Sequence, residues 1–166
     1  MVIKVVKGTG EASTPLSAFD AALKDAGVYN YNLITLSSVI PPKSKVVKTD
    51  KFETPDSEWG HKLYCVMAEE RSNEAGKHIA AGVGWYQLDD DRGLFVEHHL
   101  VGDTRLSVES ELYFRIKNSL MDLCKFRNIP WNAKRMKYEV SIDKVKSHPS
   151  SVLVIAIYES EGWKTA

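Results

Sequence analysis

The alternation of apolar and polar residues predicts a protein built from strands, with one helix near its amino terminus and a longer helix in its second half. Strands have a side-chain period of two, and fully buried strands are short continuous apolar runs. Segments of these two kinds are residues 2–6, 30–36, 62–70, 78–88, 94–101, 136–142 and 152–158.

The first helix is predicted mainly by the residues at its ends. Ser13 or Thr14 suits the N-cap, Pro15 suits the first helical position, and Gly27 suits the C-terminal cap. The second helix covers residues 107–127 and is predicted by its period. Its apolar face consists of Leu112, Ile116, Leu120, Leu123 and Cys124.

The segments between these elements are expected to be turns and loops. Residues 8–10 (Gly-Thr-Gly) predict a flexible turn, residues 43–60 predict mostly loop, and the tail after Glu159 is expected to be loose. The turns at residues 73–76 and 89–93 favour antiparallel hairpins. Together the pattern predicts an α+β fold, a mostly antiparallel sheet arrangement with helices on its outer faces.

Composition narrows the class of protein. With 166 residues the chain is most simply one domain, and its 22 basic residues balance its 22 acidic ones. That balance gives no reason to expect nucleic acid or a membrane surface as partner, and no apolar run is long enough to span a bilayer. Cys65 and Cys124 are isolated cysteines, which favours buried thiols in a cytoplasmic protein.

Histidines next to a carboxylate raise the question of a metal. His98 and His99 follow Glu97 directly in a predicted strand. Adjacent side chains of a strand face opposite sides, so these residues are not expected to join one metal site. We therefore predict no metal, and expect the two histidines at a surface or an interface.

The segment at residues 30–42 carries the candidate chemistry. It begins as a strand, stops at Pro41-Pro42, and has the hydroxyls of Ser37 and Ser38 just before the stop. Taken alone, such a pair is an ordinary polar strand end, so its interpretation depends on the neighbouring sequence.

Those neighbours resemble a known family. Residues 10–23 (GEASTPLSAFDAAL), 26–27, 30–34 (NYNLI) and 37–42 (SSVIPP), with a thinner match at 93–97 and 151–158, resemble the pyruvoyl-dependent arginine decarboxylases. The resemblance implies an αββα sandwich. It also implies trimers, or dimers of trimers, with active sites between subunits.

Decarboxylation of an amino acid needs a carbonyl that forms a Schiff base and takes up electrons. The chain can make one: attack by the Ser38 hydroxyl on the Ser37 carbonyl, followed by elimination, leaves a pyruvoyl group derived from Ser38. The chain then consists of residues 1–37 (β chain) and 38–166 (α chain).

The resemblance assigns the remaining roles. Asn32 assists the cleavage, and Glu97, surrounded by apolar residues that would keep its carboxyl protonated, is the general acid. Asp20 binds the guanidinium group of the substrate. From their spacing on the same helix face, and not from the resemblance, we expect Leu16 and Leu23 to cover its aliphatic stem. Because Asn32 lies six residues before Ser38 on an extended strand, its role requires a partner strand or subunit.

The expected function is therefore the conversion of L-arginine to agmatine and carbon dioxide by a self-processed enzyme. Two alternatives stay open. One is a pyruvoyl-dependent decarboxylase of another basic amino acid, such as histidine. The other is an uncleaved, non-catalytic relative that serves in assembly or binding.

Overall fold

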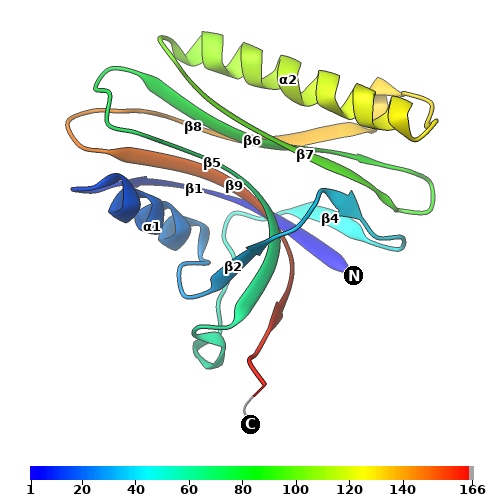
Figure 1. Ribbon diagram of the computed structural model, residues 1–166, viewed down its shortest axis with the longest axis horizontal. Helices are drawn as coiled ribbons and strands as arrows, with labels where there is room; N and C mark the ends of the chain where they lie inside the picture. The colour runs from blue at the N-terminus through cyan, green and yellow to red at the C-terminus, as the bar shows by residue number, and fades with distance from the viewer. Residues whose placement is uncertain (165–166) are drawn as a thin grey trace.

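Two sheets packed face to face form the centre of the molecule, and one helix covers the outer face of each (Figure 1). The computed structural model describes residues 1–164. Helix α1 (Pro15–Ala26) lies on the five-stranded sheet and α2 (Arg105–Phe126) on the four-stranded sheet. The predicted αββα sandwich is confirmed. Neither helix within the described residues is both long and apolar enough to cross a membrane.

The five-stranded sheet has the order β2-β5-β9-β1-β4. Its centre is antiparallel, and each of its two edge strands pairs in parallel with its neighbour. The strands are β1 (Val2–Glu11), β2 (Asn32–Thr35), β4 (Lys45–Lys48), β5 (Lys62–Ser72) and β9 (Ser150–Glu161).

The four-stranded sheet has the order β3-β7-β6-β8 and is antiparallel throughout. Its strands are β3 (Val39–Ile40), β6 (His78–Gln87), β7 (Gly93–Gly102) and β8 (Met136–Lys144). The predicted hairpin at residues 89–93 joins β6 to β7 and is confirmed. The predicted hairpin at residues 73–76 is wrong, because β9 pairs along the whole of β5 and the chain instead passes to the other sheet.

Three clusters of buried side chains hold the layers together. Trp85 and Phe95 belong to the cluster between the sheets, and a second cluster lies under α1. The third lies under α2, where the predicted apolar face is confirmed: Leu112, Ile116, Leu120 and Cys124 are buried and Leu123 is partly buried. Both cysteines are buried and free, as expected.

Strand β1 continues through the segment that was expected to turn. Gly8 and Gly10 lie inside β1, with α1 directly above them. A Cβ atom on Gly8 would lie 2.1 Å from the carbonyl oxygen of Ala22, and one on Gly10 would lie 2.2 Å from that of Ala18. The glycines thus allow the helix to approach the sheet, and the predicted turn is wrong.

Two other segments are more ordered than their sequences indicate. Within the expected loop at residues 43–60, β4 pairs with β1, and a short 3-10 helix spans Asp56–Glu58. The carboxy-terminal tail, expected to be loose after Glu159, extends β9 to Glu161. Beyond it the indole of Trp163 donates a hydrogen bond to the carbonyl of Gly60 at 2.9 Å. A second 3-10 helix, Ala133–Arg135, precedes β8.

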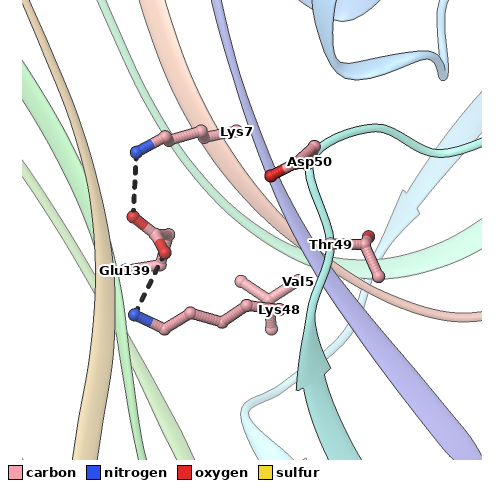
Figure 2. A pocket seen from close by; sticks show the side chains of 6 residues that line it. All are labelled: Val5, Lys7, Lys48, Thr49, Asp50 and Glu139. Carbon is pink, nitrogen blue, oxygen red and sulfur yellow. Dashed lines mark hydrogen bonds and ion pairs between the residues drawn. The ribbon is translucent and has the colours of Figure 1, made fainter.

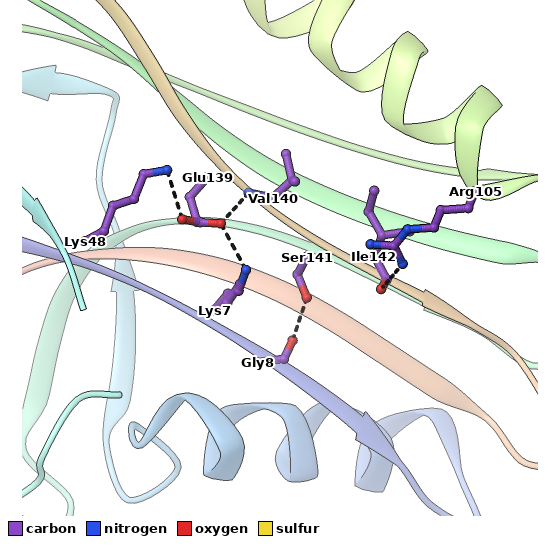
Figure 3. A network of polar contacts seen from close by, with 8 residues as sticks. All are labelled: Lys7, Gly8, Lys48, Arg105, Glu139, Val140, Ser141 and Ile142. Atoms are coloured by element: carbon purple, nitrogen blue, oxygen red, sulfur yellow. Dashed lines mark hydrogen bonds and ion pairs between the residues drawn. The ribbon is translucent and has the colours of Figure 1, made fainter. Parts of the chain in front are cut away.

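Polar contacts join the two sheets along the side formed by β1, β4 and β8 (Figure 3). Glu139 of β8 accepts from Lys7 of β1 at 3.1 Å and pairs with Lys48 of β4 at 3.0 Å. The hydroxyl of Ser141 donates to the carbonyl of Gly8 at 3.2 Å. Burial alone would raise the pKa of Glu139, but the hydrogen bonds from Lys48, Lys7 and the Val140 backbone, together with the charge of Lys48, lower that pKa.

Candidate active site

The chain crosses from one sheet to the other at residues 36–38. Strand β2 is an edge of the five-stranded sheet and β3 an edge of the four-stranded sheet, and this short connection joins them. Leu36 donates its backbone N–H to Cys65 at 2.8 Å on the first sheet, and the carbonyl of Ser38 accepts from Phe95 at 2.8 Å on the second. The peptide bond between Ser37 and Ser38 is therefore anchored on both sides.

The carbonyl group of Ser37 is held in a tight turn. Its oxygen accepts a hydrogen bond from the backbone N–H of Val39 at 2.7 Å. Such a donor polarises the carbonyl and can stabilise the negative charge that forms when its carbon is attacked. Sequence reasoning missed this donor, because a backbone N–H carries no side-chain signature.

Ser38 has a carboxylate as its hydrogen-bond partner. Its hydroxyl donates to Oε2 of Glu97 at 2.8 Å. Phe95 and Glu97 lie on the same face of β7, because side chains of a strand alternate. Phe95 is buried, but Glu97 lies beyond the short strand β3 and is exposed. The expectation that apolar neighbours bury Glu97 is thus wrong for the single chain.

A cavity of about 200 Å³ surrounds this pair and is lined by Ser38, Phe95, Val96, Glu97, His98 and Ser119. His98 is half-buried, and its Nε2 lies 2.8 Å from the hydroxyl oxygen of Ser119 on α2. Burial, with the positive charge of Arg115, lowers the pKa of His98. His98 is therefore part of the candidate site, a place that sequence reasoning did not give it.

His99 lies on the opposite face of β7 from His98, the face that also carries Glu97. Its Nδ1 pairs with Glu70 at 2.8 Å and its side chain is exposed. The two adjacent histidines thus face opposite sides, as expected for a strand. Within the part of the chain that the structure describes, no group of three or more potential metal ligands is found.

Tyr158 of β9 contacts the segment that follows Ser38. Its hydroxyl donates to the carbonyl of Val39 at 2.9 Å, and its ring packs edge-on against Phe95 with a centroid distance of 6.1 Å. Burial, and then the negative charge of Glu97, raise the pKa of Tyr158. The residue was expected only as part of an apolar strand, and nothing in that run singles it out.

The remaining predicted site residues lie apart from Ser38. The amide of Asn32 donates to the carbonyl of Gly60 at 2.7 Å. On α1, Leu16 and Asp20 are exposed and Leu23 is buried. Across residues 1–164, no hydrogen bond or ion pair joins Asp20 to a residue that lines the cavity. One chain thus brings together Ser37, Ser38 and Glu97, but not Asp20 or Asn32.

A different cavity, of about 270 Å³ (Figure 2), is lined mostly from β1, β4 and β8. Strands β4 and β8 are the sheet edges opposite β2 and β3. The cavity is lined by Val5, Lys7, Lys48, Thr49, Asp50 and Glu139. Glu139 already pairs with both lysines there, as the dashed lines in Figure 2 mark. Because this cavity contains none of the predicted site residues, we place the candidate active site at Ser38.

Comparison with known proteins identifies the family of the chain. The family described as "Pyruvoyl-dependent arginine decarboxylase (PvlArgDC)" matches residues 2–162. A pyruvoyl-dependent arginine decarboxylase of Methanococcoides burtonii is 41% identical over 101 residues, which are 60% of this chain and 56% of that protein. The Picrophilus torridus protein of the same name is 31% identical over 141 residues, or 80% of this chain and 74% of that protein.

A third similar protein is pyruvoyl-dependent arginine decarboxylase 1 of Archaeoglobus fulgidus, which is 42% identical over 95 residues, 56% of this chain and 60% of that protein. The matched parts span about half to three quarters of these relatives. Because the family match covers nearly all of the described chain, the protein belongs to the pyruvoyl-dependent arginine decarboxylase family.

Proposed function

We propose that the chain cleaves itself between Ser37 and Ser38 and then decarboxylates L-arginine to agmatine and carbon dioxide. The observation that carries the proposal is the environment of this one peptide bond. The Ser38 hydroxyl has Glu97 as acceptor at 2.8 Å, and the Ser37 carbonyl has the Val39 N–H as donor at 2.7 Å. These are the two groups that an intramolecular attack on a peptide bond needs.

The cleavage begins when Oγ of Ser38 attacks the carbonyl carbon of Ser37 and its proton passes to Glu97. The bond between this carbon and the nitrogen of Ser38 breaks as Glu97 passes the proton to that nitrogen, so that an ester and a free amine form. Loss of the α-proton of Ser38 then breaks its Cβ–Oγ bond, which frees residues 1–37 with a terminal carboxylate and leaves dehydroalanine. Its imine tautomer reacts with water, releases ammonia and becomes the pyruvoyl group.

The residues around Ser38 fit a pyruvoyl group. The carbonyl of residue 38 still accepts a hydrogen bond from the Phe95 N–H, and the Val39 carbonyl accepts one from the Tyr158 hydroxyl. The new amino-terminal group of the α chain is therefore fixed in position. The pyruvoyl group supplies the electron sink that decarboxylation requires and that no side chain offers. Glu97, at the same cavity, would deliver a proton to the α-carbon of the substrate.

Recognition of arginine is assigned to Asp20. A carboxylate accepts two parallel hydrogen bonds from a guanidinium group. Since Asp20 is exposed on α1 and does not contact the Ser38 cavity, we propose that it serves the cavity of a neighbouring subunit. Leu16, which is 69% exposed beside it, would then cover the substrate stem in a trimer or a dimer of trimers.

The test is the intact mass of the purified protein, before and after treatment with hydroxylamine. The expected result is two chains divided after Ser37, the larger of which reacts as a carbonyl compound. Arginine should then release carbon dioxide, and Ser38→Ala should be uncut and inactive. Ser37→Ala is the matched control, because it keeps the attacked carbonyl and should still be cleaved.

Other results would contradict the proposal in distinct ways. A single unreactive chain after long incubation would favour a non-catalytic relative. A cleaved, carbonyl-bearing protein that decarboxylates histidine but not arginine would support the pyruvoyl cofactor and contradict arginine as the substrate.

A further inference from the structure

The wall of the Ser38 cavity contains a second polar pair besides Ser38 and Glu97. His98 and Ser119 both line the cavity, one from β7 and the other from α2. Nε2 of His98 is engaged by the Ser119 hydroxyl oxygen at 2.8 Å. Over residues 1–164, the other ring nitrogen, Nδ1, has no hydrogen-bond partner. The ring is thus fixed at one nitrogen and free to bind at the other.

The surroundings of His98 favour its neutral form. Burial comes first among the causes that lower its pKa, followed by Arg115 of α2. On β7 itself, Glu97 acts in the opposite direction and His99 in the same one. Strand β6 places Gly82 opposite His98 and adds no charge. The cavity is therefore lined by a ring that favours its neutral form on one face of β7 and by the carboxyl group of Glu97 on the other.

A neutral donor is suited to one part of an amino-acid substrate. The α-carboxylate must be held so that the bond to be broken has a fixed direction, yet it loses its charge as carbon dioxide leaves. A full positive charge would stabilise the carboxylate of the bound substrate more than the transition state and would slow the reaction. An uncharged N–H positions the carboxylate with less of this cost.

We infer that His98 is a further substrate-binding residue, whose Nδ1–H donates a hydrogen bond to the α-carboxylate of the amino acid. The inference rests on the proposed function. It requires the Ser119 hydroxyl to donate to Nε2, which leaves the ring proton on Nδ1. Ser119 is then a positioning residue that selects the tautomer.

The experiment compares variants of His98 in the full, self-processed protein. His98→Phe keeps a ring without its nitrogens, and His98→Asn offers an amide nitrogen near the position of Nδ1. His98→Gln offers one near the position of Nε2. His99→Gln is the matched control, because His99 is adjacent to His98, exposed, paired with Glu70 and not among the residues that line the cavity. Cleavage is checked by intact mass and folding by the unfolding temperature.

The expected result is normal cleavage in all variants and a loss of kcat/KM for arginine of about tenfold or more in His98→Phe, as for one lost hydrogen bond. His98→Asn should recover more activity than His98→Gln, and His99→Gln should match the wild type. Agmatine has no carboxylate, so its inhibition constant should be the same for His98→Phe and the wild type. Ser119→Ala should lower kcat/KM for arginine without changing the inhibition constant of agmatine.

Three outcomes would overturn the inference. His98→Phe could keep kcat/KM for arginine within twofold of the wild type. The variant could instead lower kcat/KM for arginine and weaken inhibition by agmatine to the same extent, which would indicate a structural role. If His98→Phe does not fold, the same comparison is made on His98→Asn and Ser119→Ala. Finally, an uncut and inactive wild-type protein would overturn the proposed function and this inference with it, whereas the first two outcomes leave the proposed function intact.

Discussion

The hydroxyl of Ser38 donates a hydrogen bond to Glu97, which lies 59 residues further along the chain, at 2.8 Å. The contact exists because β3 brings the segment after Ser38 against β7, pairing Val39 with Leu94. In the proposed reaction Glu97 first accepts a proton from Ser38 and later donates one to the substrate.

Glu97→Gln should slow both reactions. The amide still bonds to Ser38 but can neither accept its proton nor deliver one, and general acid–base catalysis typically contributes about 10²- to 10⁴-fold. The time course of cleavage, followed by intact mass, and the release of carbon dioxide measure the two effects. Glu109→Gln on the exposed face of α2 is the control. Cleavage and turnover at wild-type rates would remove Glu97 from the mechanism.

Asp20→Asn should leave cleavage complete and raise KM for arginine by about 100-fold, since a charge-assisted bidentate contact is lost. Steady-state kinetics and intact mass check the two parts. Asp122→Asn, another exposed helical carboxylate, should match the wild type. Unchanged kinetics in Asp20→Asn would exclude the guanidinium role.

Active sites shared between subunits should complement one another. We expect Asp20→Asn and Ser38→Ala chains to be nearly inactive alone and to regain activity when they are mixed during assembly. In a mixed oligomer some cavities combine an intact Ser38 from one chain with an intact Asp20 from another. Carbon dioxide release by the co-expressed proteins measures this. Activity no greater than the sum of the separate variants would place both residues in the same subunit.

Gly10→Ala should destabilise the fold by about 3 kcal/mol, as expected for overpacking against rigid backbone. The added Cβ would lie 2.2 Å from the carbonyl oxygen of Ala18, so α1 must move away from β1. Denaturant unfolding measures the change. Thr9→Ala, on the same strand with an exposed side chain, should change stability by much less. Equal stability of the two variants would show that this close contact is absent.

Glu139 should make stability depend on pH. Its folded-state pKa lies below the ordinary value of 4.5, so its contribution is present above that value and is lost as the pH falls through the folded pKa. Glu139→Gln should therefore cost about 1 kcal/mol at pH 7, and less at progressively lower pH. Chemical denaturation at several pH values tests this, and a constant difference down to pH 3 would contradict it.

Local patterns predicted the parts of the fold that depend on local causes. The apolar face of α2 and the caps of α1 follow from spacing and from residue type, and both are present: Thr14 accepts from Ser17, and Gly27 has a left-handed conformation. The strand through Gly8 and Gly10 was missed, because those glycines serve a distant helix rather than a local turn. Likewise, whether residues 73–76 close a hairpin depends on β9, far away in the chain.

The candidate site, too, was predicted only in part, because some of its contacts depend on residues far apart in the chain. Ser37, Ser38 and Glu97 came from the resemblance to the family, and the structure brings them together. The backbone donor of Val39 and the place of His98 on the cavity wall result from tertiary packing, which no spacing along the chain indicates. The exposure of Glu97 follows from the shortness of β3, a property of the sheet edge.

Strand β1 pairs with β9 along most of its length and with β4 at its beginning. A cut after Ser37 would therefore break one covalent bond and leave every pairing of this strand in place. Residues 1–37 then behave as a tightly bound peptide whose receptor is the rest of the protein, and they can leave only if the five-stranded sheet opens. Made as separate molecules, the two pieces should recover the fold only by folding together.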